Sequence, residues 1–321
     1  MDKKELDKLT KSIDNAFGKG SFFQGKDRPR NDIKLISSGS IYLDLALGGG
    51  YPFGRIIEIF GGESSGKTTL ALQVVANVQK DGLGALFIDS EHALDMKYAN
   101  KLGVNTDDLC FSQPGYGEMA MEILDRAIDS KQFGVIVVDS VAALTPKSEI
   151  EGEVGDSMMG KHARMMSQVC RKIAAKAQKN DVIVMFINQE RAVIGGFIQN
   201  QTTTTGGKAL QFYASQRLKL QKRKQIKDGD NVIGHDINIK VVKNKIAPPY
   251  KVADVKLLYG VGISKADEII ELALEYDIID KKGSWFSYGE KRLGQGLVAV
   301  REIINTDEKL IEELLKKIKK F

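Results

Sequence analysis

The sequence has little cysteine and little histidine, and this narrows the kinds of protein it can encode. Two cysteines and three histidines occur in 321 residues. A disulfide-stapled secreted domain needs more cysteine, and His92, His162 and His235 lack the spacing of zinc ligands. Cys110 and Cys170 lie in apolar segments and are predicted to be small core residues in a reducing compartment. We therefore expect a cytoplasmic protein without zinc.

Long hydrophobic runs and strong net charge are also missing. No apolar run is long enough to span a bilayer, and the amino-terminal segment lacks the apolar stretch of a signal peptide. Hydrophobic residues make up 42% of the chain and charged residues 28%, as in ordinary globular proteins. The net charge of +5 is only mildly basic, so composition by itself does not indicate nucleic-acid binding. No membrane partner is expected.

One glycine-rich stretch carries the strongest functional signal. Residues 61–69 follow an alternating apolar strand pattern and precede a helical one. This is the context in which G-x-x-x-x-G-K-[ST] forms a phosphate-binding loop. Glycine lets backbone N–H groups surround an anion, the lysine reaches the β- and γ-phosphates, and the threonine hydroxyl holds Mg²⁺. The predicted nucleotide-binding residues are Gly61, Gly62, Glu63, Ser64, Ser65, Gly66, Lys67, Thr68 and Thr69.

From about residue 31, predicted strands alternate with predicted helices. The strands are at 55–60, 84–89, 133–139 and 182–188, and the helices at 66–80, 93–102, 117–130 and 162–179. Near-continuous apolar runs such as residues 134–138 suit strands buried on both faces of a parallel sheet. Later strands, at 211–221, 236–243 and 252–258, are closer together, which indicates antiparallel pairing at one edge. Beyond residue 265 we expect helices at 268–276, 298–304 and 310–321 and a short strand at 285–288.

These patterns divide the chain into three parts. Residues 1–30 form an arm whose apolar positions recur at helical spacing, and this arm could pack on its own core or on a neighbouring protomer. Residues 31–264 form the core, and residues 265–321 a small α/β lid. Two glycine-rich stretches in the core, 151–160 and 190–205, are too long to be simple turns. The predicted fold class is α/β, with a largely parallel central sheet, a helical arm and a small C-terminal domain.

Polar residues follow three further predicted strands. Asp139 ends one, where a phosphate-loop enzyme holds Mg²⁺. Glu91 follows another; it could orient and deprotonate an attacking water, or serve as a favourable charge at a helix N-terminus. Gln189 follows a third and could sense the γ-phosphate. Because parallel strands end at the same edge of a sheet, these side chains are expected at one crevice.

Longer strings resemble the bacterial RecA recombinase family over nearly the whole chain. They are EHALD (91–95), VDSVAALTP (138–146), EIEGEVGDS (149–157), ARMMSQ (163–168), TTTGG (203–207) and VVKNKIA (241–247). The resemblance implies a RecA-type P-loop ATPase that uses ATP and Mg²⁺. It implies DNA-dependent hydrolysis, helical filaments on single-stranded DNA, and strand exchange with double-stranded DNA in recombinational repair. Some family members also promote self-cleavage of a LexA-type repressor in the SOS response.

The resemblance also implies roles for residues around the nucleotide. Lys67 and Thr68 hold phosphate and Mg²⁺, Asp139 supports the metal, and Glu91 is the catalytic base. The stretches 151–160 and 190–205 are loops that hold single-stranded DNA, and Gln189 couples the γ-phosphate to the DNA-binding loop. The residues implied for adenine contacts are Asp95 and Tyr98.

Other implied roles concern the filament and its DNA. The arm polymerises, and Phe212 is an interface residue. Lys243 and Lys245, which stand two apart on one face of a predicted strand, reach the neighbour's ATP in the role of an arginine finger. Without the resemblance these lysines would be read as a solvated face. The implied DNA-binding residues are Met159, Arg164, Ser167, Arg171, Arg191, Ile194, Gly206 and Gly207.

Two other functions share the same ATPase residues. A ring-forming helicase would need neither the arm nor the paired loops, and a non-catalytic scaffold would use ATP only as a switch. Lys222, Arg223 and Lys224 are either a second DNA site or a solvated cluster. Glu190 lies beside the expected phosphates and is predicted to pair with a neighbouring basic side chain.

Overall fold

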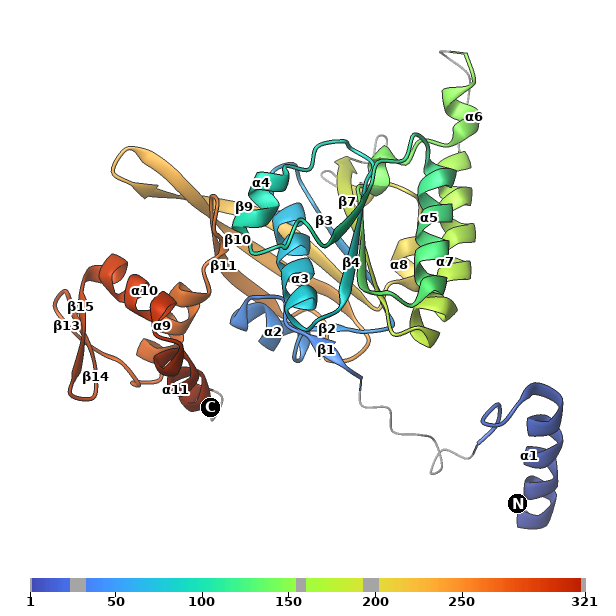
Figure 1. The fold of residues 1–321 in the computed structure, drawn as a ribbon, viewed down its shortest axis with the longest axis horizontal. Coiled ribbons are helices and arrows are strands. Elements are labelled where there is room, and N and C mark those ends of the chain that lie inside the picture. Colours follow the sequence, from blue (N-terminus) through green and yellow to red (C-terminus); the bar gives the residue numbers. More distant parts are fainter. Residues whose placement is uncertain (1, 24–32, 154–159, 193–201, 319–321) are drawn as a thin grey trace. The chain divides into compact units, whose positions relative to one another are not determined.

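The computed structural model describes residues 2–23, 33–153, 160–192 and 202–318 (Figure 1). The chain forms two compact units, Met1–Lys34 and Leu35–Phe321. The first unit contains helix α1 (Lys3–Phe17), which is capped by the Asp2 side chain and ends at Gly18. None of its side chains is buried, and Leu9 and Phe17 are among the exposed apolar residues. The arm is therefore an amphipathic helix with an apolar stripe.

A ten-stranded sheet organises the second unit (Figure 1). Its order is β12-β11-β10-β9-β3-β7-β6-β4-β5, with β8 paired to β7 outside this path. The strands from β9 to β5 in that order are parallel, and those from β9 to β12 are antiparallel. The predicted parallel sheet with an antiparallel edge is confirmed. The bounds are β3 (Ile56–Gly61), β4 (Gly84–Asp89), β5 (Leu109–Ser112), β6 (Phe133–Asp139), β7 (Ile183–Ala192), β8 (Thr202–Thr204), β9 (Gln216–Asp228), β10 (Asn231–Asn244), β11 (Val252–Leu258) and β12 (Gly262–Ile263).

Helices cover both faces of this sheet. On one face, α2 (Ile41–Leu47), α3 (Lys67–Lys80) and α4 (Met96–Lys101) share a core with Val135 and Val137. On the other, α5 (Gly117–Ser130), α7 (Lys161–Lys179) and α8 (Ala209–Tyr213) share a core with Ile136 and Val138. Side chains alternate across a strand, so this apolar run serves both layers. The short elements outside the layers are β1 (Leu35–Ile36), β2 (Tyr51–Pro52) and α6 (Lys147–Ile150).

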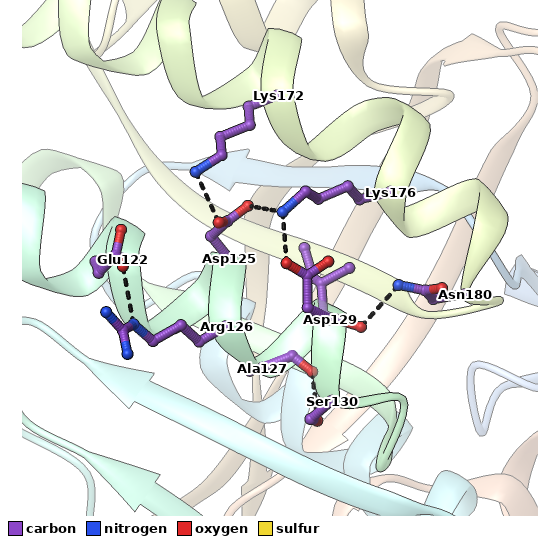
Figure 2. Close-up of polar contacts among 10 residues, drawn as sticks. Glu122, Asp125, Arg126, Ala127, Asp129, Ser130, Lys172, Lys176 and Asn180 are labelled. Carbon is purple, nitrogen blue, oxygen red and sulfur yellow. Dashed lines mark hydrogen bonds and ion pairs between the residues drawn. The ribbon is translucent and has the colours of Figure 1, made fainter.

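A polar seam joins α5 to α7 at the edge of their core (Figure 2). Asp125 accepts hydrogen bonds from Nζ of Lys172 at 2.7 Å and of Lys176 at 2.8 Å. Lys176 also donates to Asp129 at 2.6 Å. Asp125 is only 8% exposed, so its carboxylate has lost most of its water and depends on the two lysines.

We expect Asp125→Ala to lower the free energy of unfolding by about 2 kcal/mol, because it leaves the seam without its central acceptor. Glu122→Ala is the matched control on the same helix. It removes a pair with Arg126 in which both side chains are more than half exposed, and should cost less than about 0.5 kcal/mol. Urea unfolding followed by circular dichroism measures both changes. Equal losses would show that the seam contributes no more than a surface pair.

The carboxyl-terminal part has a small core of its own. Its elements are α9 (Lys265–Glu275), β13 (Asp280–Lys282), β14 (Trp285–Tyr288), β15 (Lys291–Gln295), α10 (Gly296–Thr306) and α11 (Glu308–Ile318), with the three strands in one sheet. Phe286 and Leu293 lie in the apolar cluster that joins them. Glu268 connects α9 to α2, because its carboxylate accepts hydrogen bonds from Ser40 Oγ at 2.6 Å and from the N–H of Ile41 at 2.5 Å. Burial raises the pKa of Glu268 to about 7.

Some local predictions are wrong. Residues 211–213 were predicted to begin a strand, yet they end helix α8, and β9 begins only at Gln216. Their aromatic residues favour a strand locally, but here packing on α7 decides the conformation. Cys110 is exposed because β5 is the outermost strand of the sheet, whereas Cys170 is buried as predicted.

Candidate functional site

The loop between β3 and α3 has the geometry of an anion-binding turn. Gly66 has a φ of 89°, and a Cβ there would lie 2.6 Å from Cδ1 of Leu257, so only glycine fits. The hydroxyl of Ser65 is buried and has no hydrogen-bond partner among the described residues. A buried hydroxyl of this kind can donate a hydrogen bond to an oxygen atom of a ligand. A Cβ on Gly62 would have no atom of the described residues within 4 Å, so these residues leave space for a ligand on that side of the loop.

Lys67 begins α3 and lies on the inner wall of this loop. Its Nζ donates to the carbonyl of Gly62 at 2.7 Å and to that of Gly61 at 3.4 Å. Burial lowers the pKa of Lys67, against the opposing effect of the Asp139 and Glu91 carboxylates. The negative charge of a phosphate in the loop would stabilise this ammonium, so the pKa of Lys67 would rise toward its usual value.

Thr68 and Asp139 form the adjoining part of the site. The Thr68 hydroxyl donates to Oδ2 of Asp139 at 2.7 Å and so links α3 to the end of β6. Burial raises the pKa of Asp139 to about 6 despite this hydrogen bond, and repulsion from Glu91 and Asp89 adds to the rise. A carboxylate in such negative surroundings is stabilised by a cation. Carboxylate and hydroxyl oxygens are ligands of Mg²⁺, so these residues fit that ion.

Three strand ends meet at Glu91. Its Oε1 accepts a hydrogen bond from Nε2 of Gln189, at 2.9 Å, and another from the hydroxyl of Ser140. Glu91 follows β4, Ser140 follows β6, and Gln189 lies in β7. The structure thus brings Glu91, Gln189 and Asp139 together near Lys67, at the carboxyl edge of the parallel strands.

A pocket next to the loop could receive the rest of a nucleotide. It has a volume of about 220 Å³, and residues 64–69 line it. Tyr98 also lines it, and its hydroxyl lies 2.7 Å from that of Thr69. Asp95 caps α4 by accepting a hydrogen bond from the N–H of Lys97 at 2.8 Å. The other lining residues, which the sequence predictions missed, are His235, Ile237, Leu257 and Tyr259.

A buried polar network beneath the loop was also missed. Glu58 is fully buried in β3 and accepts hydrogen bonds from Arg217 at 2.5 Å and from Asn188 at 2.9 Å. Asn188 in turn donates to the carbonyl of Thr205 at 3.0 Å. This network connects the strand that leads into the phosphate loop with the residue before Gly206. Glu58, a single glutamate in an otherwise apolar strand pattern, is the sequence feature that could have indicated this network.

The predicted DNA-binding residues on α7 share one face of that helix. Arg164, Ser167 and Arg171 are separated by three and four residues, and both arginines are exposed. Gly207 lies directly against this helix, since a Cβ on it would come within 2.9 Å of that of Ala163.

Other predicted DNA-binding residues lie nearby or cannot be placed. Gly206 has a φ of 82° beside Gly207, and Arg191 is exposed on β7. Met159 and Ile194 lie outside the described residues. Glu190 was predicted to pair with a neighbouring basic residue, and this is confirmed, because Nζ of Lys219 lies 2.8 Å from its carboxylate.

Lys243 is not close to the phosphate loop of its own chain. In the register from β10 through β9 to β3 it is level with Glu58, three residues before Gly61. Its Nζ donates to the carbonyls of Gln211 at 2.6 Å and Phe212 at 2.8 Å. Phe212 itself is 69% exposed. Lys243 therefore lies beside an open apolar residue and not at its own nucleotide site.

Lys245 differs from the prediction in one respect. Strand β10 ends at Asn244, so Lys245 does not share a strand face with Lys243. The N–H of Lys245 donates to the carbonyl of Ser215 at 2.9 Å, just beyond the end of the strand. Lys245 is exposed, and its charge is close enough to lower the pKa of Lys243.

Comparison with known proteins identifies the family. Residues 4–264 match the family model described as RecA N-terminal domain, and residues 267–321 match RecA C-terminal domain. The chain is 52% identical over 323 residues to Protein RecA of Porphyromonas gingivalis, covering 99% of this chain and 95% of that protein. For Protein RecA of Macrococcus caseolyticus the identity is 50%, covering 99% and 90%. For that of Caulobacter vibrioides it is 51%, covering 98% and 89%.

These matches extend over both units and over the residues that surround Lys67 and Glu91. The chain belongs to the RecA family and is a DNA-dependent ATPase and recombinase of DNA repair.

Proposed function

We propose that the crevice around Lys67 is where this protein hydrolyses ATP. Lys67 and the N–H groups of the loop bind the phosphates. Thr68 and Asp139 hold Mg²⁺, which supplies neutralising charge on the phosphates when bound. The observation that carries this proposal is that two sets of hydrogen bonds lie at adjacent strand ends, one joining Thr68 to Asp139 and the other joining Glu91 to Ser140 and Gln189.

Glu91 is the proposed general base. Its carboxylate is oriented by Ser140 and Gln189, and it accepts the proton of the water that attacks the γ-phosphate. Gln189 can bind either Glu91 or a phosphate oxygen with the same amide group. Movement between these partners would transmit the state of the nucleotide along β7 to residues 190–205.

The DNA site is proposed for the surface around α7. Arg164, Ser167 and Arg171 offer charge and hydroxyl groups to phosphates, and Gly206 and Gly207 offer backbone N–H groups. The proposed parts of the chain are a polymerisation arm (1–30), the ATPase core (31–264) with DNA loops 151–160 and 190–205, and a lid (265–321). Because the contacts go to the backbone, sequence would be read by the complementary strand.

The family relationship suggests further partners and a location. DNA binding and filament formation are properties of the family, and we propose both single-stranded and double-stranded DNA as substrates and a LexA-type repressor as a further partner. Within the described residues, no helix is both long enough and apolar enough to cross a bilayer. We propose that the protein acts in the cytoplasm.

The decisive experiment measures ATP hydrolysis and strand exchange together. Single-stranded DNA should raise ATP turnover at least about tenfold, and a matched duplex should be exchanged where a mismatched one is not. Raising the salt from 50 to 200 mM should weaken DNA binding by about 10³-fold or more if several phosphates are contacted. The proposal would be contradicted if ATP turnover did not depend on DNA, or if a mismatched duplex were exchanged as efficiently as a matched one.

A further inference from the structure

The pocket beside the phosphate loop contains a histidine–tyrosine pair that the roles above do not use. His235 lies in β10 and is 5% exposed, and Tyr259 follows β11 and is 53% exposed. The Tyr259 hydroxyl is 2.7 Å from Nδ1 of His235. The ring centroids are 5.5 Å apart, and the rings are tilted by 56°. Both side chains line the pocket that Lys67 and Tyr98 also line.

Tyr259 lies at a turn where packing alone does not fix its ring. Leu258 pairs with Gly262, so Tyr259 is the first of three residues that join β11 to β12. Its N–H donates to the carbonyl of Ile233 at 2.9 Å, which holds the backbone but not the side chain. A half-exposed ring has more than one rotamer open to it. The hydrogen bond to His235 selects the rotamer that lies on the pocket wall.

His235 is well placed to be the fixed member of the pair. Strand β10 is paired on both sides, with Gln225 of β9 and Leu257 of β11 opposite His235. Burial lowers the pKa of His235, and the charge of Lys222 lowers it further. The neutral ring is therefore favoured, and in that form Nδ1 can accept the phenol proton.

We propose that His235 is a positioning residue for the nucleoside end of ATP. It holds the Tyr259 ring on the wall supplied by β10 and β11, while Tyr98 comes from α4 on the other side of the phosphate loop. An ordered ring binds a nucleoside without first losing rotamer freedom, so affinity is higher than with a free ring. This inference rests on the proposed nucleotide site. It assigns no contact between His235 and ATP.

The test separates the nucleoside from the phosphates. ADP and tripolyphosphate are titrated by calorimetry into wild type and into His235→Phe, which keeps a ring but loses the acceptor. We expect ADP to bind about fivefold more weakly, the value of one neutral hydrogen bond, and tripolyphosphate to bind unchanged. The KM for ATP should rise by a similar factor with kcat unchanged. Equal ADP affinity, or an equal loss for tripolyphosphate, would overturn the proposal.

Further variants show whether His235 acts through Tyr259. Tyr259→Phe should weaken ADP binding as much as His235→Phe, and the double variant should be no weaker than either, because both remove the same hydrogen bond. His235→Asn, which keeps an acceptor at a similar position, should restore part of the affinity. Tyr250→Phe, at an exposed tyrosine outside the pocket, is the matched control. Additive losses would contradict the proposal, whereas failure of wild type to bind ADP would contradict the nucleotide site itself.

Discussion

Replacing Glu91 by glutamine is expected to lower DNA-stimulated ATP turnover by at least about 10²-fold, because an amide cannot accept the proton of the attacking water. The substitution should leave nucleotide binding intact. Glutamine has nearly the same shape, and its carbonyl oxygen can still accept the hydrogen bond from Gln189. Lys67, Thr68 and the loop are unchanged. The variant should therefore bind ATP and DNA and remain locked in the ATP-bound state.

Three measurements check this expectation. Steady-state phosphate release gives the turnover, calorimetry gives the ADP affinity, and electron microscopy shows whether ATP and single-stranded DNA still produce filaments. Filaments of Glu91→Gln should persist after those of wild type have hydrolysed their ATP. Glu122→Gln is the control, since this carboxylate is exposed on α5 and pairs with Arg126. If Glu91→Gln keeps more than a tenth of the wild-type turnover, Glu91 is not the base.

The central part of the site could be predicted because its signals are local in the sequence. The phosphate loop is contiguous, and Asp139 and Glu91 follow apolar strands whose parallel pairing brings their ends together. His235 and Tyr259 carried no such signal. They reach the pocket only because β10 and β11 pair antiparallel at the β9 side of the sheet, beyond β3, and the order of strands is a tertiary property.

The same distinction between local signals and tertiary arrangement explains the errors in the predicted fold. The apolar run before Asp139 is buried on both faces, so its pattern predicts its environment. Strands β13 and β15 contain mostly exposed residues and show no alternation, so the pattern did not predict them. Cys110 belongs to an apolar segment, but its exposure follows from the place of β5 at the end of the strand order that the described residues form. Position at a sheet edge cannot be read from composition.

Removing the ammonium groups of Lys243 and Lys245 is also expected to lower DNA-stimulated ATP turnover strongly. The double variant Lys243→Ala, Lys245→Ala should lose about 10³-fold in DNA-stimulated turnover, as when an arginine finger is removed. Lys243 is too far along the sheet to reach the phosphate loop of its own chain, and its Nζ is held by Gln211 and Phe212. ADP binding by the isolated protomer should therefore not change. Lys80→Ala, at an exposed lysine at the end of α3, is the control.

The ionisation of Lys243 adds a dependence on pH. Burial lowers its pKa to about 8, and the charges of Lys245 and Arg217 contribute. Above that pH the amine is increasingly neutral in the free protomer, so it must take up a proton before it can bind a phosphate. ATP-dependent filament assembly should weaken as the pH rises from 8 to 9. Assembly measured by light scattering should lose this dependence in Lys243→Ala.

A mixture of two inactive variants tests directly whether the lysines act on the neighbour. One chain carries Lys243→Ala and Lys245→Ala with Glu91 intact, and the other carries Glu91→Gln with the lysines intact. In a head-to-tail filament of equal parts, about one interface in four joins an intact Glu91 to intact lysines, so turnover should recover to about a quarter of the wild-type rate. Recovery requires that the lysines of one protomer serve the ATP of the next. If Glu91 and the two lysines instead acted on the ATP of the same protomer, mixing would restore no turnover, and the hydrolytic site would be complete in one chain.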